Sequence, residues 1–528
     1  MKGLIILVYL LALCIAESTS AKTYDINDYG AEADGKTLNT IAIQKAVYAC
    51  TSGDTVLIPA AQYLTGTIHL KSNITLYLEK ESMLIGSTHL TDYESYTLSN
   101  GSTGYYGILY TTGAENVAIV GLGVIQGGKQ AFPEPTSTTL YADTALLKYT
   151  RQQGNYRNGF KSIAAIAPGN PQSAVLFTGC KGILVNNISL LNTTGITLSF
   201  VACERVSVAD VIIETPLQAL GVSGVAIEGC RQVILKGCEI RSGGDAIVIC
   251  GHLEHSNQSS TIPSQNISIA NCSLQSSSTA INITALNQAS VTGVQVSQVN
   301  IIASGRGVGL LLRNAGSLEN MSFSDMYIET KQGYGNGQVN GEPIHASAVA
   351  GKDSVNLGLI NRIAFNNIFC VGENQILLYG SAQSLIQNVQ FNDVLFHIKN
   401  SAYNNTIGGN IVLWGNADQK SRLFASNIPA VMASYVTGLS FNNIKVSWVD
   451  NAMPAYFTAG IQINNFKDIR LTRCYVKAAP LSHNTHDVEL TDGSLAAVDA
   501  GDVSRIRVQE NKPIKSSSRL VNQHPRYK

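Results

Sequence analysis

The sequence predicts an all-β fold, a right-handed parallel β-helix solenoid with an N-terminal capping helix. Short apolar runs separated by turns recur from Ala174 to Arg313, and each alternates a branched apolar residue with another type. This period of two is typical of a strand with one buried face. Because one coil cannot bury its apolar face alone, coils must stack and place equivalent strands about 4.8 Å apart in a parallel sheet. The runs that align are Gly195–Phe200, Gly224–Glu228, Asp245–Ile249, Ala280–Thr284 and Val308–Arg313.

The 528 residues are predicted to form one long domain, because a solenoid grows without the size limit of a globular core. Residues 1–21 are interpreted as a signal peptide, since a basic start, the apolar run Leu4–Ile15 and small residues follow in order. The apolar run is too short to span a bilayer. Residues 22–511 form the β-helix, and residues 512–528 form a polar tail that is predicted to be disordered. We therefore expect a secreted or periplasmic protein with no membrane span, and a monomer.

The elements before the repeats also follow from local patterns. Asn39 or Thr40 is predicted to begin a helix whose apolar positions Ile41, Ile43, Ala46, Val47 and Cys50 follow the helical period. This helix would cover the exposed strand edges at the N-terminal end of the solenoid. Strands are predicted at Tyr24–Gly30, Thr55–Ile58, Thr67–Leu70, Ile74–Leu78, Val117–Ile119 and, last in the chain, Ser504–Val508.

Two residue types recur at turns and predict stacked side chains. Cys180, Cys203, Cys230 and Cys272 each follow a strand, which favours a ladder of buried thiols over disulfides or a metal site. Asn pairs recur at turns, where they tolerate left-handed geometry and can bond their stacked copies. These pairs lie in Phe365–Ile368, Phe391–Val394, Phe441–Ile444 and Ile463–Phe466.

Composition excludes one class of partner. Charged residues make up 14% of the chain and balance to a net charge of zero, so no basic patch supports nucleic-acid binding. A loop-like insert between Gln130 and Gly169 instead carries Tyr141, Tyr149, Arg151, Tyr156 and Arg157. Aromatic and Arg side chains on a long loop suit sugar stacking and carboxylate binding, with Arg151 and Tyr156 as the named candidates. A solvated capping loop is the alternative.

The chain resembles the polygalacturonase-like glycoside hydrolases, family 28. The resemblance lies in motifs that occur in order from Tyr24 to about Thr330, among them SAVLFTGCKGILVNNISLLNTTGITLSF, GCRQVILKGCEI and SGGDAIVI. It implies a parallel β-helix, in agreement with the repeats, and a pectin-like substrate containing uronate or rhamnose. The resemblance implies hydrolysis of the glycosidic bond with inversion at the anomeric carbon. Family members use three aspartates for this reaction, helped by the histidine of a Gly-His-Gly motif and by an Arg-x-Lys pair. No cofactor is implied.

Most of these family residues are replaced here. The Asn-Thr-Asp position ends in Ser223, and the paired aspartates of Ser-Gly-Asp-Asp become Gly244 and Asp245. Residues 277–279 read Ser-Ser-Thr near the histidine position, and residues 309–311 read Gly-Leu-Leu in place of Arg-x-Lys. Inverting hydrolysis needs one protonated carboxyl and one carboxylate on opposite sides of the sugar. The loss of four of the five elements therefore predicts a changed site.

The remaining polar residues on the same face supply the candidates. If Ile227, Ile249, Ile283 and Leu312 point inward, alternation directs Glu228, Asn282 and Arg313 outward, with Asp245 at the start of a strand. A His beside carboxylates can transfer protons near neutral pH. The predicted catalytic residues are Asp245, His252, Glu228 and Arg313; the predicted substrate-binding residues are Arg306, His255, Asn282, Arg151 and Tyr156. Surface or turn roles are the alternative for each, and no spacing indicates a metal site.

Three functions remain open. In the first, a secreted enzyme keeps the family's groove but uses other catalytic residues, and it either hydrolyses a sugar linkage or removes a group by elimination. For elimination, His252 would act as the base and Arg306 or Arg313 would neutralise a uronate carboxylate. In the second, hydrolysis uses an acid from a loop, such as Glu134, Asp143 or Glu254. In the third, the protein is a non-catalytic glycan-binding relative. Carboxylates and histidines clustered in the groove would favour an enzyme, whereas aromatic and amide groups alone would favour binding.

Overall fold

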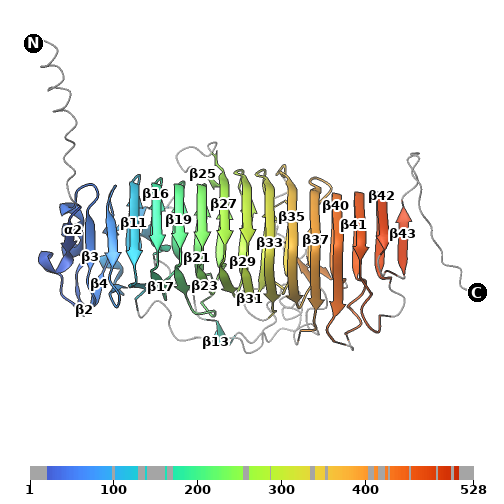
Figure 1. The fold of residues 1–528 in the computed structure, drawn as a ribbon, viewed down its shortest axis with the longest axis horizontal. Coiled ribbons are helices and arrows are strands. Elements are labelled where there is room, and N and C mark those ends of the chain that lie inside the picture. Colours follow the sequence, from blue (N-terminus) through green and yellow to red (C-terminus); the bar gives the residue numbers. More distant parts are fainter. Residues whose placement is uncertain are drawn as a thin grey trace, which may run out of the picture.

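The computed structural model describes the chain from residue 21 to residue 510 with gaps. In this part, 35 strands belong to one continuous sheet that winds into a parallel β-helix, so the predicted fold class is confirmed. Figure 1 shows the coils stacked along the long axis, with the helix at the N-terminal end. No described helix is long and apolar enough to cross a membrane. The described residues are 21–97, 101–128, 137–138, 161–162, 171–219, 221–253, 261–285, 287–332, 339–350, 355–401, 410–413, 423–425, 428–450, 453–482, 486–500, 503 and 505–510.

Three parallel ladders form the sides of the solenoid. The first ladder contains β5 (Ile68–His69), β10 (Leu109–Thr112), β15 (Ser173–Thr178), β18 (Ile196–Val201), β21 (Ser223–Glu228), β24 (Ile247–Cys250), β29 (Thr279–Ala285), β32 (Arg306–Leu312), β34 (Ile344–Ala348) and β36 (Ile376–Tyr379). The second contains β1 (Thr23–Asp25), β3 (Thr55–Ile58), β6 (Thr75–Leu78), β11 (Glu115–Gly121), β16 (Lys181–Asn186), β19 (Glu204–Ala209), β22 (Arg231–Lys236), β27 (Ser264–Ala270) and β30 (Val291–Ser297). The third contains β2 (Asp34–Leu38), β4 (Gln62–Thr65), β7 (Met83–Gly86), β12 (Val124–Gln126), β17 (Ser189–Leu191), β20 (Ile212–Glu214), β23 (Glu239–Ser242), β28 (Ser273–Ser276) and β31 (Asn300–Ser304).

Toward the C-terminus, single strands continue from one ladder into the next. They are β33 (Leu318–Thr330), β35 (Ile360–Gly372), β37 (Ile386–Ile398), β40 (Val431–Trp448), β41 (Ile461–Cys474) and β42 (Val488–Ala500), followed by β43 (Ile506–Glu510). Four short antiparallel pairs lie outside the ladders: β8 (Ser95–Thr97) with β9 (Thr103–Tyr105), β13 (Ser137–Thr138) with β14 (Lys161–Ser162), β25 (His252–Leu253) with β26 (Thr261–Ile262), and β38 (Asn410–Val412) with β39 (Leu423–Ala425).

The N-terminal end is covered by helix α2 (Thr40–Ala49), flanked by the 3₁₀ turn η1 (Ile26–Tyr29); a second 3₁₀ turn, η2 (Leu90–Asp92), precedes β8. The predicted helix is therefore confirmed, although Ile41 is 71% exposed and Ala42 takes its place against the core. The strand predicted at Tyr24–Gly30 is wrong in its second half, where Asp25 accepts a hydrogen bond from the Asn27 N–H and starts η1. Such a side-chain bond stabilises a turn at the expense of the strand.

Stacked side chains fill the core. Phe323, Phe365, Phe391 and Phe441 lie above one another on successive coils, with ring centroids 4.9, 4.8 and 4.9 Å apart. All four are fully buried. This spacing equals the distance between neighbouring strands, because the rings occupy the same register position in each coil. The apolar core therefore runs along the solenoid axis.

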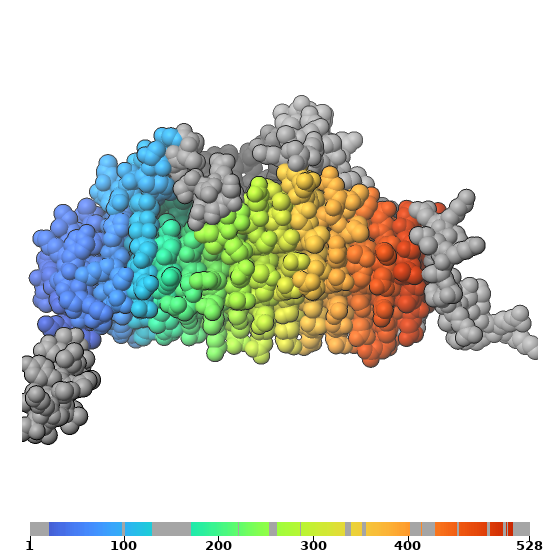
Figure 2. Space-filling model, turned by 90° about the horizontal axis from the view of Figure 1, so that it is seen from above, coloured from blue at the N-terminus to red at the C-terminus, as the bar shows by residue number. Residues whose placement is uncertain are grey.

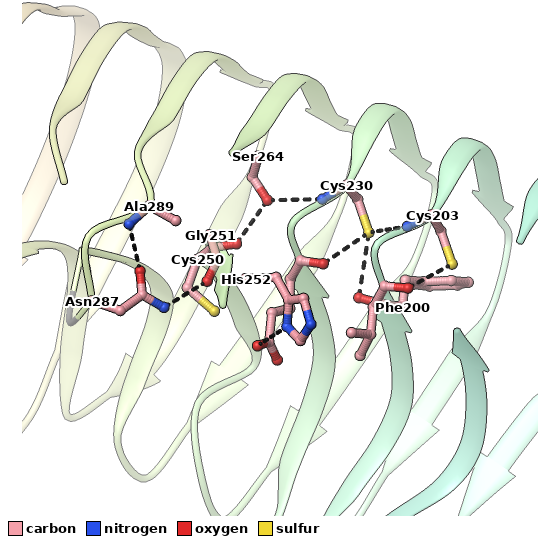
Figure 3. Close-up of polar contacts among 11 residues, drawn as sticks. Phe200, Cys203, Cys230, Cys250, Gly251, His252, Ser264, Asn287 and Ala289 are labelled. Carbon is pink, nitrogen blue, oxygen red and sulfur yellow. Dashed lines mark hydrogen bonds and ion pairs between the residues drawn. The ribbon is translucent and has the colours of Figure 1, made fainter. Parts of the chain in front are cut away.

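The cysteine ladder is confirmed in part. Cys203 and Cys230 lie on successive coils, and the Cys203 N–H approaches the Cys230 Sγ at 3.3 Å (Figure 3). Cys180 precedes them in the same corner, because Lys181 pairs with Glu204. Cys272 does not belong to this ladder: Ser273 pairs with Glu239, which places Cys272 beside Cys238 in another corner. All described cysteines are unpaired thiols. The Asn pair in Ile463–Phe466 was also predicted to stack on the other Asn turns. It does not, because Asn464 pairs with Ser434 and therefore lies at a different position of the coil.

The other Asn turns form the predicted stack. Asn367 donates to Asp325, and Asn443 donates to Asp393, each at 2.7 Å across one coil. Asn367, Asp393 and Asn443 all have left-handed φ angles between 51° and 56°. These residues are therefore structural, as their sequence pattern predicts.

We expect Phe391→Ala to lower the free energy of unfolding by about 3–5 kcal/mol, because it removes a fully buried ring from the middle of the Phe stack. The urea unfolding midpoint measures this loss. The control Ile234→Ala removes a side chain that is 52% exposed and should change stability by less than about 1 kcal/mol. Equal losses for the two variants would contradict the axial stack as the main source of stability.

Candidate functional site on the first ladder

The outward face of the first ladder carries the candidate site. Ile227, Ile249, Ile283 and Leu312 are fully buried, which confirms the predicted alternation. The residues between them form two outward rows across successive coils. The first row contains Ala226, Val248, Asn282, Gly309 and His345; the second contains Glu228, Cys250, Thr284, Leu311 and Ser347.

Asp245 is held at the start of β24 by two donors. Its Oδ1 accepts from the Thr279 backbone N–H at 2.9 Å, and its Oδ2 accepts from Asn282 Nδ2 at 2.6 Å. The other end of the same amide, Asn282 Oδ1, is buried and has no hydrogen-bond partner in the structure described. A buried acceptor without a partner is costly, so a water or a sugar hydroxyl would be stabilised there. The predicted residues Asp245 and Asn282 are therefore in contact.

Glu228 and His252 form the second part of the site. Glu228 Oε1 lies 2.7 Å from His252 Nδ1, and the side chains are 36% and 16% exposed (Figure 3). Gly229 allows this approach, because a Cβ there would come within 2.5 Å of the His252 Cβ. The structure thus brings two of the predicted catalytic residues into contact.

Cys250 lies between the predicted residues but is not a nucleophile. Burial and the neighbouring Glu228 raise the pKa of its thiol to about 12. A thiol with such a pKa stays protonated near neutral pH, and the thiolate is the reactive form.

The two parts do not form one cluster. Asp245 precedes β24, whereas Glu228 pairs with Cys250 at its other end. The Asp245 carboxylate contacts Asn282, which stands opposite Val248, whereas Glu228 stands opposite Cys250, two residues further along β24. The predicted residues therefore form two hydrogen-bonded pairs on one face, Asp245 with Asn282 and Glu228 with His252.

A buried charged cluster lies two coils further on. Arg306 Nη2 lies 3.5 Å from Glu342 Oε1, and the same oxygen lies 3.4 Å from His345 Nδ1. His345 Nε2 is 3.0 Å from Ser347 Oγ. All four side chains are buried. Arg306 was predicted to face a substrate, but its guanidinium is enclosed with Glu342.

Arg313 closes this cluster from the end of β32. Its Nη1 donates to the carbonyl oxygens of Leu312 and Ser347 at 2.9 and 2.8 Å, and its Nη2 donates to Ser347 Oγ at 2.8 Å. The residue is 4% exposed. The expectation of an outward-facing Arg313 is therefore corrected: its side chain is buried against β34.

Burial and charge set the protonation of the cluster. Arg306 and His345 hold the pKa of Glu342 at about 2, against the opposing effect of burial. Burial and the neighbouring Arg306 lower the pKa of His345 to about 4. At neutral pH the cluster therefore contains a carboxylate and a neutral imidazole.

Glu342 and His345 were missed by the sequence analysis. Both lie in the segment GEPIHASA, where polar residues interrupt an apolar strand. Aligning Ile344–Ala348 as a further rung would have placed His345 in the same outward row as Asn282. The last aligned run of the sequence prediction is Val308–Arg313, so the prediction did not include the run at Ile344–Ala348.

Gly244 and Gly309, two positions where the resemblance leads one to expect charged family residues, lie near Asp245 and Asn282. A Cβ at Gly244 would lie 2.8 Å from Ser223 Oγ and 2.9 Å from the Val222 backbone, so residue 244 has no room for a side chain. Gly309 lies beside Asn282, since a Cβ there would be 3.4 Å from both Asn282 Oδ1 and Arg306 Cδ. Among the residues described, no three His, Cys, Asp or Glu side chains could hold a metal ion. The predicted residues His255, Arg151 and Tyr156, and the loop acids Glu134, Asp143 and Glu254, lie outside the described residues.

The model of the family described as glycosyl hydrolases family 28 matches residues 50–403. The chain belongs to this family. It is 26% identical over 271 residues to an exo-poly-α-D-galacturonosidase of Dickeya chrysanthemi, covering 46% of this chain and 44% of that protein. It is 26% identical over 252 residues to a probable polygalacturonase of Vitis vinifera, covering 44% of this chain and 45% of that protein. The matches thus span less than half the length of these two relatives.

Solved structures agree on the fold of this family 28 member. The family 28 exopolygalacturonase of Yersinia enterocolitica superposes with a TM-score of 0.60 and 16% identity, covering 85% of this chain and 78% of that one. The exopolygalacturonase of Thermotoga maritima gives a TM-score of 0.58 and 19% identity, covering 80% and 91%. At this identity the likeness concerns the fold.

We expect His345→Gln to make stability less sensitive to mild acid. The folded pKa of His345, about 4, lies below the ordinary value of 6.5, so the unfolded chain takes up a proton that the folded protein excludes. Stability from this residue is present above pH 6.5 and falls as pH drops toward 4, by up to about 1.4 kcal/mol per pH unit. Unfolding midpoints at pH 7.5, 6.5, 5.5 and 4.5 measure the two slopes.

The comparison contains its own control. Above pH 7 both side chains are neutral, so the stability difference between wild type and His345→Gln should not depend on pH. Parallel curves down to pH 4.5 would contradict a neutral, buried His345.

Proposed function

We propose that this family 28 protein acts on uronate- or rhamnose-containing cell-wall oligosaccharides through a site that differs from the family's paired aspartates. The contact between Glu228 and His252 carries the proposal, because it places a partly exposed imidazole and a carboxylate on the outward face of the first ladder. Such a pair is suited to proton transfer near neutral pH. Family membership supports a carbohydrate substrate of the pectin type.

Elimination is the reaction that a single imidazole base supports best. If His252 Nδ1 carries the hydrogen and donates it to Glu228, the lone pair resides on Nε2, which then acts as the base. The base removes the proton from the carbon beside a uronate carboxylate, and a double bond forms between that carbon and its ring neighbour. The bond from this neighbour to the glycosidic oxygen breaks, and the oxygen leaves in its protonated form. Arg306 and Arg313 are enclosed by β34, so the group that neutralises the substrate carboxylate is not one of these two.

Asp245 and Asn282 are assigned to binding. Asp245 already accepts hydrogen bonds at both oxygens, whereas Asn282 Oδ1 is a buried acceptor without a partner in the described structure. We assign this oxygen to a sugar hydroxyl, which as a donor would complete its hydrogen bonding. Loss of Asn282 would then weaken binding, and loss of His252 would slow the chemical step.

Hydrolysis is the second candidate, favoured by family membership. It requires an acid and a base on opposite sides of one bond, and both oxygens of Asp245 are already engaged by Thr279 and Asn282. A third possibility, a non-catalytic glycan-binding relative, would retain Asn282 binding without turnover. Secretion or periplasmic location, and a monomeric state, belong to the same proposal.

We expect His252→Ala to reduce turnover at least 100-fold, because it removes the proton-transfer group. The purified protein is incubated with plant and algal oligosaccharides, and reducing ends and ultraviolet absorbance of unsaturated products are followed separately. Elimination generates ultraviolet absorbance, and hydrolysis generates reducing ends alone. Neither signal, together with retained oligosaccharide binding, indicates a glycan-binding protein.

Two further variants separate the roles. Glu228→Gln, which keeps the shape of the side chain but loses its charge, should shift the pH dependence of turnover. Glu204→Gln is the matched control, because Glu204 also contacts a basic side chain, Arg231 at 2.6 Å, but lies on the second ladder. Turnover that is unchanged in both His252→Ala and Asp245→Asn would reject the proposed site.

A further inference from the structure

The outward face of the first ladder is bounded at both ends. Toward the N-terminus, Tyr96 and Tyr106 pack the β8–β9 hairpin onto Tyr110 of β10, with successive ring centroids 4.6 and 3.8 Å apart. Figure 2 shows the light-blue residues of this hairpin standing above the body of the solenoid. Toward the C-terminus, Leu413 packs on Leu377 of β36. The strands between these boundaries carry the two hydrogen-bonded pairs of the candidate site.

Val248 lies between the two pairs. It stands beside Asn282 on one neighbouring coil and beside Ala226 on the other. Ala226 lies two residues before Glu228 on β21. The side chain of Val248 is partly exposed, so a ligand can contact it. A sugar chain that extends from Asn282 to the His252 imidazole therefore crosses an apolar surface.

This apolar surface extends toward the N-terminal boundary. Leu176 and Ser199 precede Ala226 in the same outward row. In the second outward row, Val201 stands beside Glu228. Leu176 and Val201 are partly exposed. This part of the face therefore offers uncharged contacts to a sugar, most of them from aliphatic side chains.

Carboxylates flank Val248 on two sides. Asp245 precedes it on β24, and Glu228, whose side chain is 36% exposed, stands opposite the end of the same strand. A uronate carboxylate over Val248 would be repelled by both, because like charges repel. The His252 imidazole must be neutral to act as the base, so it leaves the charge of Glu228 in place.

A methyl ester of the uronate removes the charge that these carboxylates repel. The added methyl group is apolar, so its burial on Val248 and Ala226 is favourable. An ester also suits elimination, because the electron pair left by proton removal develops beside a neutral carbonyl and not beside a carboxylate. Arg306 and Arg313, which are enclosed by β34, are then not needed for the reaction.

We propose that this face binds a methyl-esterified uronate oligosaccharide, with the ester methyl of one sugar on Val248 and Ala226. His252 Nε2 takes the proton from the carbon beside the ester carbonyl, and the electron pair forms a double bond to the neighbouring ring carbon. The bond from that ring carbon to the glycosidic oxygen breaks, and the oxygen takes a proton from water. This step rests on the proposed function, whereas preferential binding of the ester does not.

Binding is measured by calorimetry with the full chain carrying His252→Ala to suppress turnover. The probes are a fully methyl-esterified homogalacturonan oligosaccharide and the de-esterified oligosaccharide of the same length. We expect the ester to bind at least about 10-fold more tightly, because it gains apolar contact and avoids repulsion. Equal affinities, or tighter binding of the de-esterified probe, would overturn the proposal.

Val248→Lys tests the surface itself. It replaces the apolar contact with a cation, so it should weaken binding of the ester and strengthen binding of the de-esterified probe, each about 3- to 10-fold. Ile234→Lys is the matched control, because Ile234 is also an exposed aliphatic residue facing outward from a strand, on the second ladder. It should leave both affinities unchanged. Unchanged affinities in Val248→Lys would reject the assigned contact.

Salt provides a measurement that needs no second substitution. Raising the ionic strength from about 0.05 M to about 0.5 M screens the repulsion. The de-esterified probe should then bind several-fold more tightly, and the affinity of the ester should be nearly constant. A de-esterified probe that binds more weakly in salt would indicate attraction by cations and contradict the proposal. This result decides if Val248→Lys does not fold.

The ester preference and the proposed function can fail separately. If wild type generates neither absorbance nor reducing ends from either probe but still binds the ester more tightly, the preference stands and the enzyme proposal falls. If turnover depends on His252 while the de-esterified probe binds and reacts better, the enzyme proposal stands and the preference falls.

Discussion

The register between stacked coils is the constraint on which the rest of the structure depends. Each strand pairs residue for residue with the next coil, so a side chain at one position lies about 4.8 Å from its equivalent. Several side chains therefore meet a like or complementary group: Phe365 meets Phe391, Cys203 meets Cys230, and Asn443 meets Asp393. The same rule aligns the outward rows, and so a site on this face is assembled from residues on successive coils.

The backbone beside Asp245 restricts what residue 244 can be. The Val222 backbone comes within 2.9 Å of the place a Cβ would take at Gly244, so an aspartate there would force the corner apart. Gly309 differs, because its surroundings at 3.2 to 3.4 Å are side-chain atoms of Thr279, Arg306 and Asn282. The space beside Gly309 is thus bordered by groups that belong to this chain's own polar network.

Alternation and repeat spacing predicted the fold and the inward residues, and they selected Glu228, His252, Asp245 and Asn282 as candidates without predicting which of them touch. They did not predict which corner a motif occupies: Cys272 resembles the other thiols in its local pattern, but it follows a strand of the second ladder. Nor did they predict which outward residues are buried. Arg306 and Arg313 lie on the expected ladder, yet both are enclosed by side chains from Glu342 to Ser347, which are distant in sequence. Alternation gives the direction of a side chain and contains no information about what covers it.

The buried charges of Arg306 and Glu342 hold the outward face at β32 and β34 in one conformation. Removing a carboxylate or a guanidinium from water costs several kcal/mol, and only a close partner offsets that cost. Glu342 meets Arg306 and His345 through one oxygen, and its Oε2 accepts from the Asn340 N–H, so the carboxylate is bound from three directions. Moving any one member would leave another buried and unpaired. The cluster therefore fixes β32 against β34, and Gly309 and Asn282 lie in the row beside it.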